Sequence, residues 1–144
     1  MNPRQRQARF ERLRQIDQQK LERLAEVTRK AAAQVERARH HLRQAQEQFQ
    51  RELLAAGERP ELADQLGAWE RRSQHELASL QAQLNEATKS WEAARQAVEQ
   101  QQNRIRAWDK LLERVGAEVV AAELAVEMRL ADESYMQKQI RQRI

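Results

Sequence analysis

Residues 77–126 read LASLQAQLNEATKSWEAARQAVEQQQNRIRAWDKLLERVGAEVVAAELAV. Starting at Leu77, the positions spaced alternately three and four residues apart are apolar as far as Val126, with Gln101 as the one exception. A spacing that averages about 3.5 residues over this length is typical of a coiled-coil helix. Because an apolar stripe needs a cover in water, we expect a second helix of this chain, or a partner, to lie against it.

A matching stripe lies earlier in the chain, between Phe10 and Leu53, and it is interrupted by a polar residue at Asp17. Between the two stripes, Gly57 is expected to end the first helix in the left-handed conformation, and Pro60 can open the next helix. A connection this short makes the two helices antiparallel neighbours. We therefore predict an all-α fold, a single antiparallel coiled-coil hairpin spanning residues 1–144, with helices of residues 3–56 and 61–140 and a loop of residues 57–60.

The register of this hairpin follows from a simple rule, because facing residues of an antiparallel pair have numbers with a constant sum. If Phe49 faces Trp69, the same sum places Phe10 against Trp108. It also places Asp17 opposite Gln101, so that the two irregular positions of the stripes coincide. We expect a buried polar layer there, which fixes the register at some cost in stability.

The second predicted helix is longer than the first, and this difference leaves an apolar surface. With Phe10 against Trp108, residues beyond about 114 are expected to have no partner within the chain. An apolar stripe of this extent on an unpaired helix marks an interaction surface. The stripe continues there through Val115, Val119, Ala122 and Val126, and it is flanked by Val120, Leu124, Met128 and Leu130.

Composition favours long helices with a thin seam between them, and the charge is unevenly distributed along the chain. Charged residues make up 33% of the 144 residues and aromatic residues only 4%, and cysteine is absent, which excludes a disulfide scaffold and a thiolate metal site. No run of residues approaches the roughly 20 apolar residues of a membrane span. Residues 1–60 carry 14 basic and 8 acidic residues, a net charge of +6. Such an arm is either a solvated arginine-rich helix face or a surface for nucleic acid or an acidic protein.

The sequence contains no catalytic constellation. Its three glycines are too scattered for a phosphate-binding loop. The histidines, His40, His41 and His75, are expected on the surface, since no further metal ligand stands near them. We expect a protein that is not an enzyme and that uses no cofactor and no metal.

A local stretch carries a resemblance to a known family. Residues 104–114 read RIRAWDKLLER and are followed by AAE at 121–123, MR at 128–129 and DE at 132–133, with a weaker match at KSW, residues 89–91. This pattern resembles the FliJ family of flagellar export stalk proteins and their YscO-type counterparts in virulence type III secretion. The resemblance implies a cytoplasmic protein, peripheral to the inner-membrane export apparatus, that binds a hexameric export ATPase and links it to the membrane export gate. Export chaperones are further partners that it implies, whereas nucleic acid and direct membrane insertion are not expected.

The resemblance also implies two partner-binding ends. The end that faces the ATPase would contain Arg4, Arg9, Phe10, Trp108, Val115, Val119, Glu123, Val126 and Met128. The end that faces the export gate would lie near the tip and contain Leu42, Phe49 and Trp69.

Two other classes of function remain open at this point. A scaffolding coiled coil that oligomerises through its C-terminal helix would use the same apolar surface. Binding of nucleic acid through the basic first helix is disfavoured, because no exposed aromatic residues alternate with its arginines.

Overall fold

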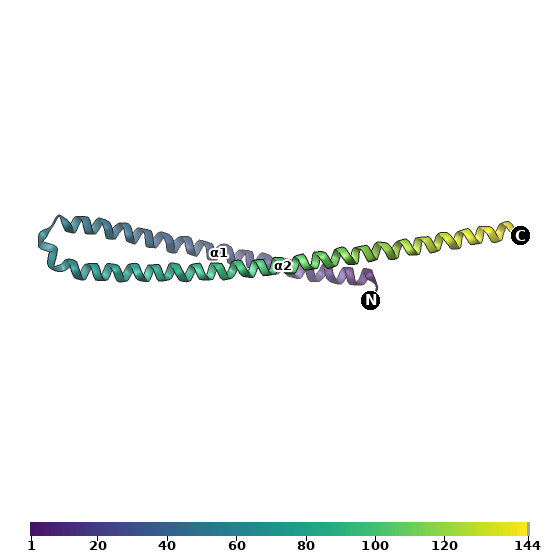
Figure 1. Ribbon diagram of the computed structural model, residues 1–144, viewed down its shortest axis with the longest axis horizontal. Coiled ribbons are helices and arrows are strands. Elements are labelled where there is room, and N and C mark those ends of the chain that lie inside the picture. Colours follow the sequence, from purple (N-terminus) through teal and green to yellow (C-terminus); the bar gives the residue numbers. More distant parts are fainter. Residues whose placement is uncertain (144) are drawn as a thin grey trace. The chain divides into compact units, whose positions relative to one another are not determined.

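The computed structural model describes residues 1–143, which form two long α-helices joined by a tight turn (Figure 1). Helix α1 comprises Pro3–Gly57, a 3-10 turn comprises Pro60–Leu62, and helix α2 comprises Ala63–Arg143. The helices contain 55 and 81 residues, respectively, and the described residues contain no strand. The predicted all-α hairpin with a longer second helix is thereby confirmed. Within residues 1–143, neither helix contains a segment that is long and apolar enough to cross a membrane.

Helix α1 begins with a reciprocal cap. The side-chain oxygen of Asn2 accepts a hydrogen bond from the backbone N–H of Gln5 at 2.8 Å, and the Gln5 side chain accepts one from the Asn2 backbone at 3.1 Å. Pro3 occupies the first turn, where its missing N–H is not needed. These contacts satisfy amide groups that have no partner inside the helix, and they hold the start of α1 at Pro3.

The turn differs from the sequence-based expectation in the conformation of Gly57. Glycine was expected to end α1 with a positive φ, but no glycine of the described residues has one. Instead, the last turn tightens, since Glu58 N–H donates to Ala55 O at 3.3 Å and Arg59 N–H donates to Ala56 O at 3.1 Å. These shorter-range bonds satisfy the carbonyl groups that a left-handed cap would otherwise engage.

Contacts within the chain group the residues into two compact units. The tip unit contains Glu22–Glu99, and the terminal unit contains Met1–Leu21 together with α2 from Gln100 onward. In the tip unit, α1 and α2 lie side by side and run in opposite directions from the turn (Figure 1). Its buried α1 residues repeat at the predicted spacing and are Ala31, Val35 and Leu42. The α2 residues of the predicted stripe are half-buried and include Leu77, Leu80, Leu84, Ala87, Trp91 and Ala94.

The terminal unit has its own core, and this core extends further along α2 than the sequence predicted. Val115 is only 4% exposed and Val119 is half-buried, so the expectation that α2 lacks a partner beyond residue 114 was wrong. The constant sum of the register already places Val115 opposite Pro3, the first residue of α1, so the limit of 114 was set too early. The side chains also lean toward the N-terminus of their own helix. In an antiparallel pair, the early residues of α1 therefore reach toward later residues of α2.

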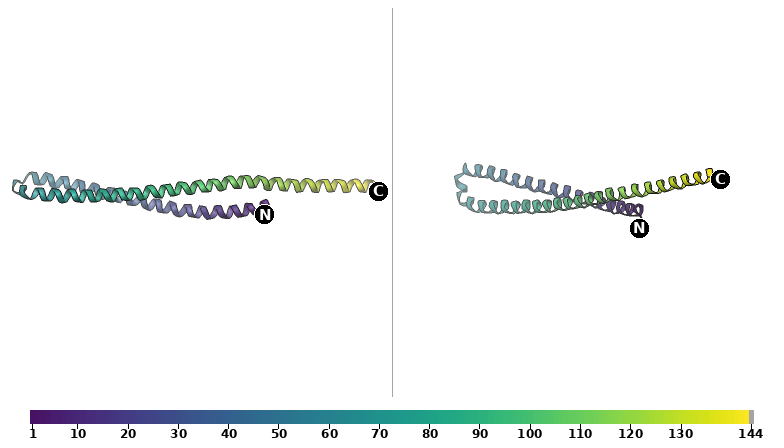
Figure 2. Two further views of the ribbon diagram at one scale, coloured as in Figure 1. Left: turned by 60° about the horizontal axis from the view of Figure 1, so that its bottom comes forward. Right: turned by 45° about the vertical axis from the view of Figure 1, so that its right-hand side comes forward.

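Beyond this core, α1 buries no residue of α2 within the described part of the chain, although Arg4 still pairs with Glu123. In both views of Figure 2, the C-terminal end of α2 continues past the N-terminal end of α1. Every residue from Val120 to Arg143 is exposed. We call this segment, residues 120–143, the overhang.

Candidate functional site

A buried polar layer lies inside the terminal unit, at the position that the register predicted. Asp17 is 7% exposed and Gln101 is 3% exposed. The Gln101 side-chain amide donates to the backbone carbonyl of Asp17 at 2.8 Å. Trp108 adds a contact that the sequence did not predict, because its indole N–H donates to the Asp17 carboxylate at 2.5 Å. Arg104 lies 3.5 Å from the same carboxylate.

These contacts favour the ionised form of Asp17. The hydrogen bond from Trp108 is the main influence that lowers the pKa of the Asp17 carboxyl, and burial opposes it. Gln101 and the positive charge of Arg104 lower this pKa further. Asp17 can therefore stay ionised inside the seam between the helices, because several hydrogen-bond donors and a positive charge stabilise its carboxylate.

The lowered pKa of Asp17 predicts a pH dependence of stability. Because the folded-state pKa lies below the ordinary value of about 3.9, ionised Asp17 stabilises the fold above about pH 4. This contribution is lost as the pH falls through the folded-state pKa. We therefore expect the difference in free energy of unfolding between the wild type and an Asp17→Asn variant to be constant above about pH 5 and to shrink below about pH 4. Urea denaturation over a pH series measures this difference, and parallel stability curves would contradict the prediction.

In the terminal unit, aromatic packing and ion pairs also connect the part of α1 before Asp17 to α2. The rings of Phe10 and Trp108 have centroids 5.8 Å apart, as the register predicted. Arg14 pairs with Asp109 at 2.6 Å. Near the start of α1, two further ion pairs join Arg4 to Glu123 and Arg6 to Glu118. All three pairs are solvated and each contributes at most about 1 kcal/mol, so they orient the end of α1 more than they stabilise it.

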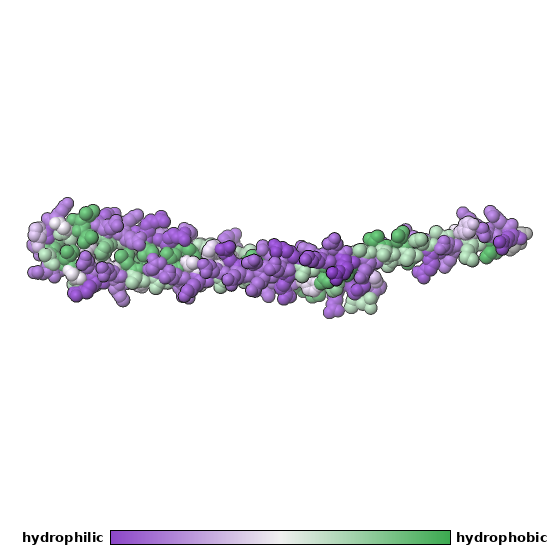
Figure 3. Space-filling view, viewed as in Figure 1, coloured by the Kyte–Doolittle hydropathy of each residue, from purple (hydrophilic) through white to green (hydrophobic). Residues whose placement is uncertain are grey.

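A groove of about 520 Å³ lies where α1 begins. On one side it is lined by Asn2, Pro3 and Arg4, and on the other side by α2 residues that include Val119 and Val126. The groove leads directly into the overhang, where Val126 is 44% exposed. An apolar surface thus continues from a partly covered seam onto a free helix. Figure 3 shows apolar atoms along α2 in this region, just beyond the N-terminal end of α1.

The tip unit carries an aromatic pair close to the turn. The rings of Phe49 and Trp69 are stacked at 5.0 Å with an angle of 3° between their planes, which confirms the predicted contact. Both side chains are half-buried. The indole N–H of Trp69 donates to Glu52 at 2.8 Å. The hydrogen bond from Gln48 is the main influence that lowers the pKa of the Glu52 carboxyl, and the hydrogen bond from Trp69 lowers it further.

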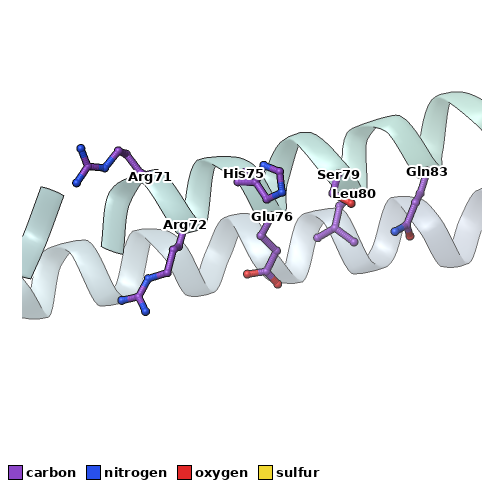
Figure 4. Close-up of a pocket in the computed structure, with 7 residues that line it drawn as sticks. All are labelled: Arg71, Arg72, His75, Glu76, Ser79, Leu80 and Gln83. Atoms are coloured by element: carbon purple, nitrogen blue, oxygen red, sulfur yellow. The ribbon is translucent and has the colours of Figure 1, made fainter. Parts of the chain in front are cut away.

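The surface of the tip unit carries several grooves, of which two are larger than 500 Å³. One, of about 520 Å³, is formed where the helices meet the turn, and Ala56, Leu62 and Trp69 help to line it. The other, of about 610 Å³, lies on α2 alone and is shown in Figure 4. Its seven lining side chains are Arg71, Arg72, His75, Glu76, Ser79, Leu80 and Gln83. Because one helix supplies all of them, this second groove has no opposite wall to enclose a small ligand.

The predicted partner-binding residues divide into packed and accessible ones. At the end assigned to the ATPase, Val115 is buried, Phe10, Trp108 and Val119 are half-buried, and Arg4, Arg9, Glu123, Val126 and Met128 are exposed. At the tip, Leu42 is a core residue at 7% exposure, whereas Phe49 and Trp69 remain partly accessible. The accessible surface at the ends of the chain is therefore centred on the overhang, whereas the tip offers an aromatic pair beside a groove.

Candidate ligands for a metal or cofactor do not gather at either end. Among residues 1–143, no group of three or more His, Cys, Asp or Glu side chains is placed to hold a metal ion. His40 and His41 are neighbours, with ring centroids 6.4 Å apart, and both are exposed. No protein-family model matches the chain, and comparisons with curated protein sequences and with solved structures find no significant similarity.

Proposed function

We propose that this protein is a non-enzymatic central-stalk component of a type III protein export apparatus, flagellar or virulence. In this role, the terminal unit binds the hexameric export ATPase, and the tip unit contacts the export gate in the membrane. The protein acts in the cytoplasm, peripheral to the inner-membrane apparatus. The proposal combines the resemblance of residues 104–133 to the FliJ family with one structural observation, the exposed apolar overhang of α2.

The overhang supports a binding role because of the apolar side chains that it exposes. These residues are 44–65% exposed and comprise Val120, Leu124, Val126, Met128, Leu130, Tyr135, Met136 and Ile140. Complete burial of one such side chain contributes about 1.5–3 kcal/mol, so covering even half of them in a complex supplies a large part of a binding free energy. Exposure of so many on one segment is uncommon in a protein that works alone.

The mechanism that we propose is allosteric. A hairpin with two unlike helices presents different side chains to each subunit of a six-fold ring. It changes the nucleotide states of the subunits only through contacts that differ between those states. Arg4 and Arg6 are already paired with acidic residues of α2. The exposed apolar side chains of the overhang supply further contacts that are available for the ring.

The tip unit supplies the second contact of this proposal. Trp69 of the stacked pair lines the groove at the turn, and Leu54, near the end of α1, is 73% exposed. Aromatic residues that stay partly accessible are common at the centres of protein interfaces. Contact with the gate at this end would leave the terminal unit free for the ATPase.

The test uses the full chain and the hexameric export ATPase of the same organism. We expect the chain to promote ring assembly, measured by sedimentation, and to raise ATP turnover. A Val126→Gln, Leu130→Gln variant should weaken both effects about tenfold or more, because each change removes an apolar contact. Leu54→Gln, at the tip, is the matched control and should leave both effects unchanged. If the wild-type chain alters neither assembly nor turnover, the stalk role is wrong.

A scaffolding coiled coil that oligomerises through its C-terminal helix is the alternative, and the same overhang favours it. Sedimentation of the chain alone distinguishes the two. A stable dimer or larger species that the Val126→Gln, Leu130→Gln variant abolishes, together with no effect on the ATPase, would support the scaffold.

A further inference from the structure

Helix α2 carries a second apolar stripe in the terminal unit, on the side turned away from α1. Its positions are again spaced alternately three and four residues apart, from Ala117 to Tyr135. At about 100° per residue, these positions lie on the face opposite Val115, Val119 and Val126. The stripe consists of Ala117, Ala121, Leu124, Met128, Ala131 and Tyr135.

Burial shows that α1 does not cover this second face. Val119 of the first stripe is half-buried, whereas Val120, one residue further and beside the second stripe, is 65% exposed. Leu124, Met128 and Tyr135 are 54%, 61% and 63% exposed, respectively. The second stripe is therefore available where the first is already partly occupied. A helix with two opposite stripes of this spacing can pair with two helices at once.

The charges beside the stripe indicate what covers it. In a coiled coil, the residues next to the apolar positions meet the corresponding residues of the partner helix. Here the charged residues at those positions are all acidic, namely Glu118, Glu127 and Asp132. Glu118 pairs with Arg6, and neither Glu127 nor Asp132 has an ion-pair partner among residues 1–143.

From this pattern, we propose that the second stripe binds an amphipathic helix of another protein whose flanking positions carry lysine or arginine. The stripe is about 27 Å long, which matches a partner segment of about five helical turns. A second copy of this chain does not fit, because its own stripe would place acidic residues against acidic residues. The acidic flanks also oppose nucleic acid and anionic lipid surfaces. This proposal goes beyond the export role and does not depend on it.

The test uses a synthetic probe and no export protein. The probe is a labelled four-heptad peptide with leucine at its apolar positions and lysine at all flanking positions. The control peptide has glutamate at the flanking positions, so like charges prevent either peptide from pairing with itself. We expect fluorescence anisotropy to show that the full chain binds the lysine peptide about tenfold or more tightly than the glutamate peptide.

Two variants locate the binding face. Leu124→Gln, Met128→Gln, Tyr135→Gln should weaken binding of the lysine peptide about tenfold or more, because it removes the large apolar residues of the second stripe. Val126→Gln, Leu130→Gln on the opposite face is the matched control and should change the affinity less than about twofold. Glutamine favours the helix almost as well as leucine, so far-UV circular dichroism should show the same helix content in both variants.

A charge exchange tests the chemistry of the partner. Glu127→Lys, Asp132→Lys should reverse the preference, so that the glutamate peptide binds more tightly than the lysine peptide. Equal binding of the two peptides to the wild type, or equal losses in the two face variants, would overturn the proposal. A wild-type dimer that only the second-stripe variant abolishes would overturn it as well, since the stripe would then bind a second copy.

Discussion

Replacing Ile105 by Asp is expected to lower the free energy of unfolding by about 3 kcal/mol. Ile105 is 7% exposed and lies in the small core of the terminal unit. The substitution removes a buried apolar side chain and places a carboxylate at a position that is 7% exposed. Because the seam is only two helices thick, the new carboxylate can reach water in part, which keeps the loss near the lower end of the range for a buried charge.

A matched control separates burial from helix propensity. Ala107→Asp places the same residue type two positions along α2, at an exposed site. It should cost less than about 1 kcal/mol, since only the weaker helix propensity of aspartate acts there. Urea denaturation followed by far-UV circular dichroism measures both variants. Similar losses in the two would show that Ile105 is not part of a core.

Replacing Asp17 by Ala is expected to destabilise the protein by about 2 kcal/mol, although it removes a charged residue from an apolar seam. The loss arises because the indole N–H of Trp108 would lose its acceptor while the ring stays half-buried. Arg104 would also lose the carboxylate that it faces. A buried donor without a partner costs more than the hydrogen bond contributes when it is formed.

Asp17→Asn provides the comparison, because an amide oxygen can still accept the indole N–H. We expect it to lose about half as much stability as Asp17→Ala at neutral pH. Both variants are compared with the wild type by urea denaturation, and equal losses would argue that the hydrogen bond to Trp108 contributes little. A rise in stability in the alanine variant would contradict the prediction outright.

The register of the hairpin could be predicted because its two irregular positions coincide. An aspartate in one stripe and a glutamine in the other leave a single alignment in which neither faces an apolar residue. The structure confirms it, with Asp17 and Gln101 both buried and with Phe49 stacked on Trp69. Spacing determines which residues share a face, and for a two-helix protein this information fixes most of the fold.

Spacing alone does not determine where side chains point or what they donate to. The hydrogen bond from Trp108 to Asp17 depends on the rotamers of both residues, and the apolar pattern is the same with or without it. The limit of residue 114 for the cover over α2 was set too early, since the constant sum already places Val115 opposite Pro3. Side chains also reach along the helix axis, and a count of facing positions does not include this reach. Gly57 was assigned a positive φ from a general preference of glycine, whereas local backbone hydrogen bonds complete the turn without it.

The three tryptophans are shared unequally between the two units. Trp69 and Trp91 belong to the tip unit and Trp108 to the terminal unit, where its indole is hydrogen-bonded to a carboxylate. Each of the two units therefore contains an intrinsic fluorophore, and the emission of an indole responds to its immediate surroundings. With phenylalanine in place of Trp69 and Trp91, the remaining signal reports on the polar layer by itself. The kinetics of that region can then be followed without attaching a dye.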